Sequence, residues 1–223
     1  LFAVYSPENQ PIELHLAKWV EKYNRKPFGP GPTERMTWDE AREGMFDLAD
    51  HFSFVSPRAE EEALTPIDIM EAASVLFDDD MSEKKYGLVL DPWNELAHDW
   101  PQHMSETKYI GDMLGLIRRW ARARKVHVFL VAHPQKVPRE NGKLPIPRPD
   151  MISGSQHWWN KADAAICVHR DFADYGRPEV EIHVQKIRHR HLGHPGIATL
   201  LYDKVTGLYR PYLRPVGTVQ GIK

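Results

Sequence analysis

Residues 86–90 form a short apolar run that ends in Asp91 and turns at Pro92. This pattern is typical of a buried parallel strand, whose carboxyl end lies at the sheet edge where α/β proteins bind ligands. A carboxylate at that edge can bind a Mg²⁺ ion that bridges the phosphates of a nucleotide. An Asp-Pro pair also forms turns after core strands that have no chemical role. Asp91 is therefore a candidate metal ligand, and both interpretations stay open on this segment alone.

Two other strand-like runs also end in side chains that can do chemistry. Glu8 follows the run at residues 2–5, and a carboxylate there can orient and deprotonate an attacking water. A Glu before a helix is also favoured by the helix dipole alone. His133 follows the apolar run at residues 126–132 and can hydrogen-bond a terminal phosphate, although a lone strand-end His is more often structural. Both residues are candidates whose role depends on where the strands lie.

A long loop rich in Pro, Lys and Arg follows His133 and runs into a Ser-Gly segment. Basic side chains and Ser/Gly backbone N–H groups both bind phosphates, so the loop is a candidate for contact with a nucleic-acid backbone. A solvated surface loop explains the same composition. The candidate DNA-binding residues are Lys136, Arg139, Lys143, Arg148, Ser153, Gly154 and Ser155.

Lys186 and Arg188 stand two residues apart at the end of a predicted strand. Side chains at that spacing point to the same face, so together they can reach a γ-phosphate as a lysine and an arginine finger. A solvated basic turn is the alternative. Histidines follow them, but no Cys or carboxylate completes a metal site in this turn.

The 223 residues contain no GxxxxGK[ST] segment. The Gly-Pro-Gly-Pro stretch at residues 29–32 cannot replace it, because proline lacks the N–H donor that a phosphate-binding loop needs. The chain as given therefore lacks the main clamp for a nucleoside triphosphate.

Composition describes an ordinary globular chain with 42% hydrophobic and 27% charged residues. The net charge of −2 hides an acidic half, residues 1–117, and a basic half, residues 118–223. A basic half can follow a phosphate backbone, which favours a polyanionic partner unless the halves interleave in the fold. No apolar run approaches the length of a membrane span, and one cysteine, Cys167, gives no disulfide framework, so we expect a reducing cytoplasm.

Periodicity predicts alternating strands and helices in the first half and hairpin-like strands in the last third. The predicted fold class is α/β, a mainly parallel sheet flanked by helices with antiparallel C-terminal strands. We see no internal boundary, so residues 1–223 are interpreted as a single domain. The chain begins at Leu1 inside an apolar run, and we interpret it as truncated at the N-terminus. The predicted strands are 2–5, 52–56, 86–90, 126–132, 164–169, 180–186, 197–202 and 208–212, and the predicted helices begin near Pro11, Thr37, Thr65 and Ser105.

Taken in order, these segments resemble the RecA-like ATPase domain of hexameric replicative DNA helicases, of the DnaB/Twinkle type and of phage or prophage primase-helicases. Each motif is weak alone, and the ordered set is fairly specific over residues 1–203. One departure is Ile187, where the family usually has Asn, and another is the missing P-loop, expected just upstream of Leu1. The resembling blocks are Ser6-Pro-Glu8, Asp91-Pro-Trp-Asn-Glu95, Val131-Ala-His133-Pro-Gln-Lys136, Ser153-Gly-Ser155 with Asn160-Lys161-Ala-Asp163, and Lys186-Ile-Arg188 with Gly193.

The resemblance implies a motor that hydrolyses ATP with Mg²⁺ and translocates along single-stranded DNA. It implies that Glu8 is the catalytic base, that Asp91 binds Mg²⁺, and that His133 senses the γ-phosphate. Lys186 and Arg188 would enter the ATP site of the neighbouring subunit in a homo-oligomer, expected to be a hexameric ring. By the same resemblance the basic loop lies in the central channel. The protein would work in the cytoplasm of a bacterial or phage-infected cell, and no membrane partner is expected.

Three other functions stay open on the sequence. The first is a RecA-like recombinase or plasmid replication ATPase. The second is a catalytically inert domain that binds nucleic acid or a partner, which the missing P-loop favours. The third and weakest is a nuclease that uses Asp91, Glu95 and the histidines.

Overall fold

The computed structural model describes residues 1–59, 62–77, 85–135, 145–152, 156–170 and 176–213. Within this part of the chain, no helix is long and apolar enough to cross a membrane.

Four parallel strands form the first sheet, in the order β2-β1-β3-β4. They are β1 (Phe2–Tyr5), β2 (Phe52–Phe54), β3 (Tyr86–Leu90) and β4 (Val126–Leu130). Each register is unbroken, with β1 pairing with both β2 and β3, and β3 pairing with β4. Since all four strands run the same way, the residues that follow β1, β3 and β4 emerge at one edge of the sheet.

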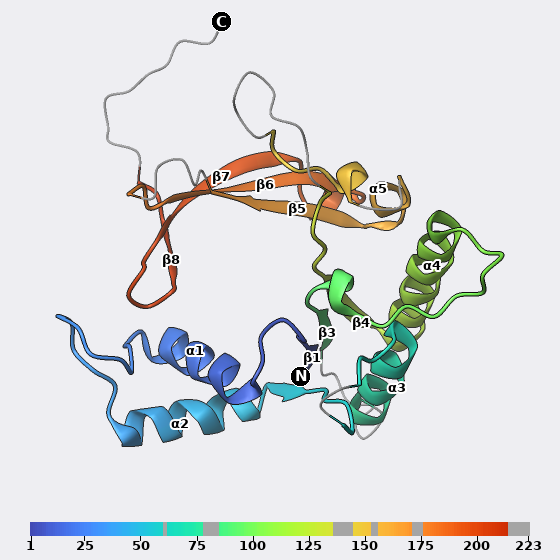
Figure 1. The fold of residues 1–223 in the computed structure, drawn as a ribbon. Helices are drawn as coiled ribbons and strands as arrows, with labels where there is room; N and C mark the ends of the chain where they lie inside the picture. The colour runs from blue at the N-terminus through green and yellow to red at the C-terminus, as the bar shows by residue number, and fades with distance from the viewer. Residues whose placement is uncertain (60–61, 78–84, 136–144, 153–155, 171–175, 214–223) are drawn as a thin grey trace, which may run out of the picture.

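Helices cover both faces of this sheet, with α1 and α2 on one side and α3 and α4 on the other (Figure 1). They are α1 (Ile12–Asn24), α2 (Trp38–Ala49), α3 (Pro66–Phe77) and α4 (Glu106–Arg124). The larger core joins α3 and α4 to the inward side chains of β1 and β3, and its fully buried members are Ala3, Ile69, Ala73, Leu88 and Leu90.

Local signals set the helix boundaries. Thr37 and Glu40 form a reciprocal capping box at the start of α2, as the Thr-x-x-Glu spacing predicts. Ser105 caps α4 by accepting the backbone N–H of Lys108. The other end of α4 closes on Lys125 in the left-handed conformation.

The last third of the chain forms a separate antiparallel sheet in sequence order, β5 to β8. Its strands are β5 (Ala164–His169), β6 (Glu179–Ile187), β7 (Gly196–Tyr202) and β8 (Tyr209–Pro211). The short helix α5 (His157–Lys161) precedes it and packs against α4. Figure 1 shows this sheet beyond the two helical layers, reached by the chain that leaves β4.

The predicted fold class is confirmed, and most predicted elements agree with the structure to within a few residues. The C-terminal strands form their own sheet rather than continuing the parallel one, because among the described residues β4 pairs only with β3 and β5 only with β6. Four short helices were not predicted from the sequence, namely α5 and the one-turn helices at Trp93–Glu95, Pro149–Met151 and Arg190–Leu192.

Candidate functional site

Three side chains that follow neighbouring parallel strands are positioned at one edge of the sheet. Glu8 comes after β1, Asp91 directly after β3, and His133 shortly after β4. Nε2 of His133 lies 3.7 Å from Oε2 of Glu8, and both side chains are about half exposed. The structure thus brings together Glu8 and His133, which are far apart in the sequence, where water and a ligand can reach them.

Asp91 is held in place by two polar residues from the segment after β1. The hydroxyl of Ser6 donates to Oδ2 of Asp91 at 3.2 Å, and Nδ2 of Asn9 donates to the Ser6 hydroxyl at 2.9 Å. The same Asn9 amide lies 3.5 Å from Oδ2 of Asp91. The backbone N–H of Asp91 donates to the carbonyl of Tyr5, which extends the pairing of β1 and β3 by one residue. These bonds connect the Asp91 carboxylate directly to the strand end that carries Glu8.

The donor set around Asp91 suits a magnesium ion. Mg²⁺ prefers oxygen ligands and usually takes one or two carboxylates together with waters and substrate phosphates. Asp91 supplies a carboxylate, and Ser6, which is buried, supplies a hydroxyl oxygen beside it. No group of three or more His, Cys, Asp or Glu residues that could enclose a metal occurs in the described part of the chain. An ion here would therefore share its coordination with a substrate.

His133 is fixed through its backbone as well as by its position after β4. Its N–H donates to Oδ1 of Asn94 at 2.8 Å, and the N–H of Trp93 donates to the carbonyl of Val131 at 2.8 Å. The one-turn helix after Asp91 is therefore tied to the end of the next strand at two points. The turn after β3, which follows Asp91, and the segment after β4, which carries His133, are consequently fixed relative to each other.

An aromatic cluster packs around Trp93, in the one-turn helix that follows Asp91. The rings of Trp93 and Trp158 meet edge to face with their centres 5.3 Å apart, and the tilted ring of His98 lies 4.5 Å from that of Trp93. Nε2 of His98 donates to the Trp93 carbonyl, while Nδ1 lies 3.2 Å from the hydroxyl of Tyr109. Burial lowers the pKa of His98, which keeps the ring neutral and matched to these two partners.

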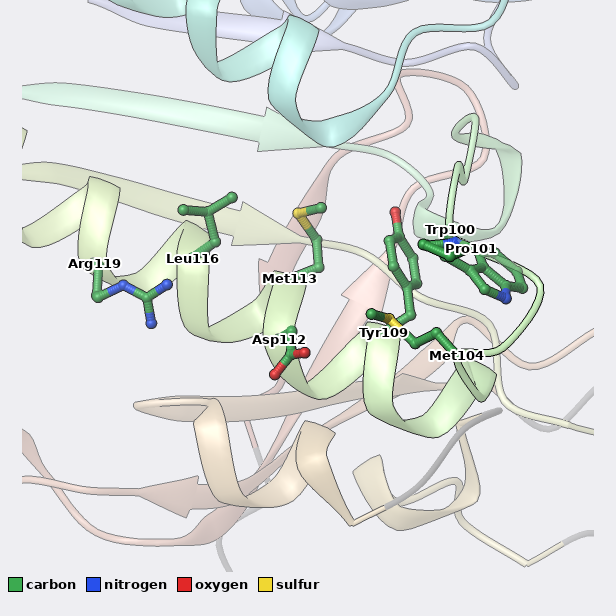
Figure 2. Close-up of a pocket in the computed structure, with 8 residues that line it drawn as sticks. All are labelled: Trp100, Pro101, Met104, Tyr109, Asp112, Met113, Leu116 and Arg119. Atoms are coloured by element: carbon green, nitrogen blue, oxygen red, sulfur yellow. The ribbon is translucent and has the colours of Figure 1, made fainter.

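An apolar pocket of about 260 Å³ opens beside this cluster, on α4 and the loop before it (Figure 2). Trp100 stacks on Tyr109 at 4.8 Å and forms one wall. Met104, Met113 and Leu116 line the rest, with the charged groups of Asp112 and Arg119 at the rim. None of the candidate site residues lines this pocket, so it is distinct from the sheet edge that carries them.

The basic pair is found elsewhere, against the end of α5. The Lys186 ammonium donates to the carbonyl of Trp159 and lies 5.4 Å from the centre of that ring. Arg188 donates to the carbonyl of Asn160 at 2.6 Å and pairs with Asp163. Both side chains thus contact the same segment, residues 159–163. No contact joins either of them to the sheet-edge residues within the part of the chain that the structure describes.

The candidate DNA-binding loop is described only in part. The guanidinium of Arg148 binds Asp150 through two parallel bonds of 3.0 Å. The remaining predicted residues of this group lie outside the described residues, namely Lys136, Arg139, Lys143, Ser153, Gly154 and Ser155.

The residues that hold the site residues in place were not predicted from the sequence. Ser6, Asn9 and Asn94 bind Asp91 or His133 directly, and Asp163 binds both Arg118 and Arg188. Four of the five lie in or beside a motif already singled out, and that adjacency was the available signal. Arg118 lies within α4 and gave no signal, because its partner is 45 positions away.

Similarity to known proteins is clear in one sequence and in the fold. No protein-family model matches the chain. It is 36% identical over 215 residues to the Twinkle homolog protein, chloroplastic/mitochondrial, of Arabidopsis thaliana, an alignment that covers 93% of this chain and 29% of that protein. The chain therefore spans less than a third of the length of that relative.

Two solved structures share the fold at 15% sequence identity. One, an ATPase domain, has a TM-score of 0.76, covering 96% of this chain and 75% of that one. A DnaB-like replicative helicase, solved in a study of its interactions with primase, has a TM-score of 0.75, covering 96% and 52%. The chain therefore has a RecA-like α/β fold, which it shares over 96% of its length with this ATPase domain and with the DnaB-like replicative helicase.

Proposed function

We propose that this domain belongs to an ATP-driven replicative DNA helicase, in which it forms most of the motor. The observation that carries the proposal is the convergence of Glu8, Asp91 and His133 at the carboxyl edge of three adjacent parallel strands. That edge is where open α/β sheets bind their ligands. The sequence similarity to a Twinkle homologue and the shared helicase fold support the same function.

The reaction is in-line attack of water on the γ-phosphate of ATP. Glu8, whose carboxylate is exposed at the sheet edge beside His133, orients the water and accepts its proton. Asp91, oriented by Ser6 and Asn9, would hold the Mg²⁺ ion, which when bound neutralises charge on the phosphates. His133 hydrogen-bonds the γ-phosphate, and its backbone bond to Asn94 transmits the loss of that contact to the turn after β3.

The phosphate clamp has an obvious place in this architecture. Among the described residues, β4 and β5 each pair on one side only. Both strands carry exposed apolar side chains, namely Phe129 on β4 and Ile166 and Val168 on β5. A strand with an unpaired side and exposed apolar residues readily pairs with another strand. We place the P-loop on a strand from outside these residues that pairs with β4, next to His133. The chain would then bind ATP only together with that segment.

Lys186 and Arg188 act on the ATP bound by the neighbouring subunit of a homo-oligomeric ring, which we propose is a hexamer. Both cations lie apart from the sheet edge of their own subunit, as a pair acting in trans requires. An arginine finger stabilises charge that develops on the transferring phosphoryl group and contributes about 10³- to 10⁵-fold to kcat. The basic loop after His133 would contact the backbone of single-stranded DNA in the central channel, since phosphate contacts need no sequence preference.

DNA-stimulated ATP hydrolysis by the full-length protein that contains these residues tests the proposal. We expect turnover in the wild type and losses of at least about 10³-fold in Glu8→Gln and Arg188→Ala, with nucleotide binding retained in both. Asp39→Asn is the matched control, because it removes an exposed Asp–Arg pair on α2 far from the site. A full-length wild type that shows no turnover with single-stranded DNA would refute the motor.

Two observations favour a second candidate, a domain that binds nucleic acid without catalysis. The 223 residues have no GxxxxGK[ST] segment, and their second half is strongly basic. An inert domain would bind single-stranded DNA equally well with and without ATP. A motor would instead change its DNA affinity with the nucleotide bound, so a DNA titration in the presence and absence of ATP separates the two.

A further inference from the structure

One carboxylate lies between two arginines at the base of the antiparallel sheet. Oδ1 of Asp163 lies 2.6 Å from Nε of Arg188 and 2.8 Å from a terminal nitrogen of Arg118. Arg118 comes from the middle of α4, Asp163 from the segment between α5 and β5, and Arg188 from the end of β6. A single acidic side chain thus joins three separate elements of the fold.

Arg188 is held by more than this ion pair. Its Nη2 donates to the carbonyl of Asn160 at 2.6 Å and to that of Ala162 at 3.1 Å. Its backbone N–H donates to the carbonyl of Asp163 at 2.7 Å. Because the guanidinium is planar, fixing Nε and Nη2 fixes the direction of Nη1 as well. Among the described residues Nη1 has no protein acceptor, so it is the donor left for an external ligand.

Asp163 is also what allows the cations here to lie close together. Lys186 lies close enough for the positive charges of Arg188 and Arg118 to lower its pKa, after the larger effect of burial, while Asp163 raises it. Nε of Arg118 is buried without a hydrogen-bond partner, so Arg118 depends on its bond to Asp163 for stabilisation. Removing the carboxylate would leave three neighbouring cations without the negative charge that reduces their mutual repulsion.

We propose that Asp163 is a positioning residue that holds the Arg188 guanidinium in the orientation needed to reach a γ-phosphate on the neighbouring subunit. This inference rests on the proposed function, in which Arg188 acts in trans. Preorganised donors stabilise transition-state charge without the cost of reorienting during the reaction. Asp163 therefore affects kcat through Arg188 and touches neither nucleotide nor water itself.

Asp163→Asn in the full-length protein is the direct test, because it keeps the side-chain shape and an oxygen acceptor but removes the charge. We expect kcat for DNA-stimulated ATP hydrolysis to fall about 10-fold, with the KM for ATP changed less than twofold, since the lost contact acts in the transition state. Asp163→Glu keeps the charge and should retain more than a third of kcat. Asp39→Asn, which breaks an exposed Asp–Arg pair on α2, should change neither constant.

A double-mutant comparison separates positioning from a general structural role. In an Arg188→Ala background, measured under single-turnover conditions, Asp163→Asn should have no further effect on the rate, because the route through Arg188 is gone. A further loss of about 10-fold in that background would overturn the inference and leave the function of Arg188 intact. Full turnover in Arg188→Ala alone would overturn both the inference and the trans assignment on which it rests.

Mixed rings provide an independent readout. Glu8→Gln subunits lack the base but carry an intact finger, whereas Asp163→Asn subunits carry an intact base and a misplaced finger. Mixing the two should restore turnover above that of either variant alone, as should mixing Glu8→Gln with Arg188→Ala. If only the Arg188→Ala mixture recovers activity, Asp163 does not act through the finger and the inference fails.

Discussion

Ser6→Ala tests whether the bonds that hold Asp91 matter for the metal as well as for the fold. Ser6 is 4% exposed, and its hydroxyl donates to Asp91 at 3.2 Å and accepts from Asn9 at 2.9 Å. The substitution removes both bonds. At about 0.5–1.5 kcal/mol for each bond, the free energy of unfolding should fall by roughly 1–3 kcal/mol.

For a domain of this size, such a loss lowers Tm by about 2–4 °C per kcal/mol, and hence by about 2–12 °C in total. The functional effect should be larger than this loss of stability suggests. Residues that hydrogen-bond a metal ligand typically change metal affinity by about 10- to 100-fold when mutated. We therefore expect the Mg²⁺ concentration for half-maximal ATP hydrolysis by the full-length protein to rise by at least about 10-fold.

Ser105→Ala is the matched control, because the Ser105 hydroxyl caps α4 through one hydrogen bond and lies outside the site. It should lower the free energy of unfolding by about 1 kcal/mol and leave the Mg²⁺ dependence unchanged. A thermal melt and a Mg²⁺ titration on both variants complete the experiment. If Ser6→Ala lowers Tm but gives the same Mg²⁺ curve as the wild type, the assignment of Asp91 and Ser6 to a metal site is wrong.

Two further predictions concern the core beneath the site. Leu88→Ala on β3 removes a fully buried side chain and should lower the free energy of unfolding, measured by denaturant titration, by about 2–5 kcal/mol. The control is Leu14→Ala on the exposed face of α1, which should change this free energy by less than about 0.5 kcal/mol. Burial holds the pKa of His98 below its ordinary value of 6.5 in the folded state, so the unfolded chain binds the proton more readily. The stabilisation from neutral His98 is present above pH 6.5 and is lost as the pH falls below it, and His98→Gln should flatten this part of the stability curve. Equal slopes in wild type and His98→Gln between about pH 7.5 and 5.5 would show that His98 does not contribute to the pH dependence.

Local sequence determined most of the secondary structure, because its signals act over a few residues. The capping box at Thr37, the apolar run of β5 and the helical spacing in α4 each involve residues close together in the sequence. That Glu8, Asp91 and His133 share an edge follows from one further rule, that parallel strands joined by helices end on the same side. The short helix α5 gave no such signal, because five residues are too few for a periodicity to appear.

Only the tertiary structure decided which partner each polar group meets. Asn94 and His133 are 39 positions apart, and Arg118 and Asp163 are 45 apart, so no spacing in the sequence connects them. The separation of the strands into two sheets was equally hidden, since a strand's own pattern does not specify which edge it leaves open. The sequence by itself therefore determined the elements and the candidate residues at their ends, whereas Asp163 as the partner of Arg188 emerged only from the folding of α4, α5 and β6 around one carboxylate.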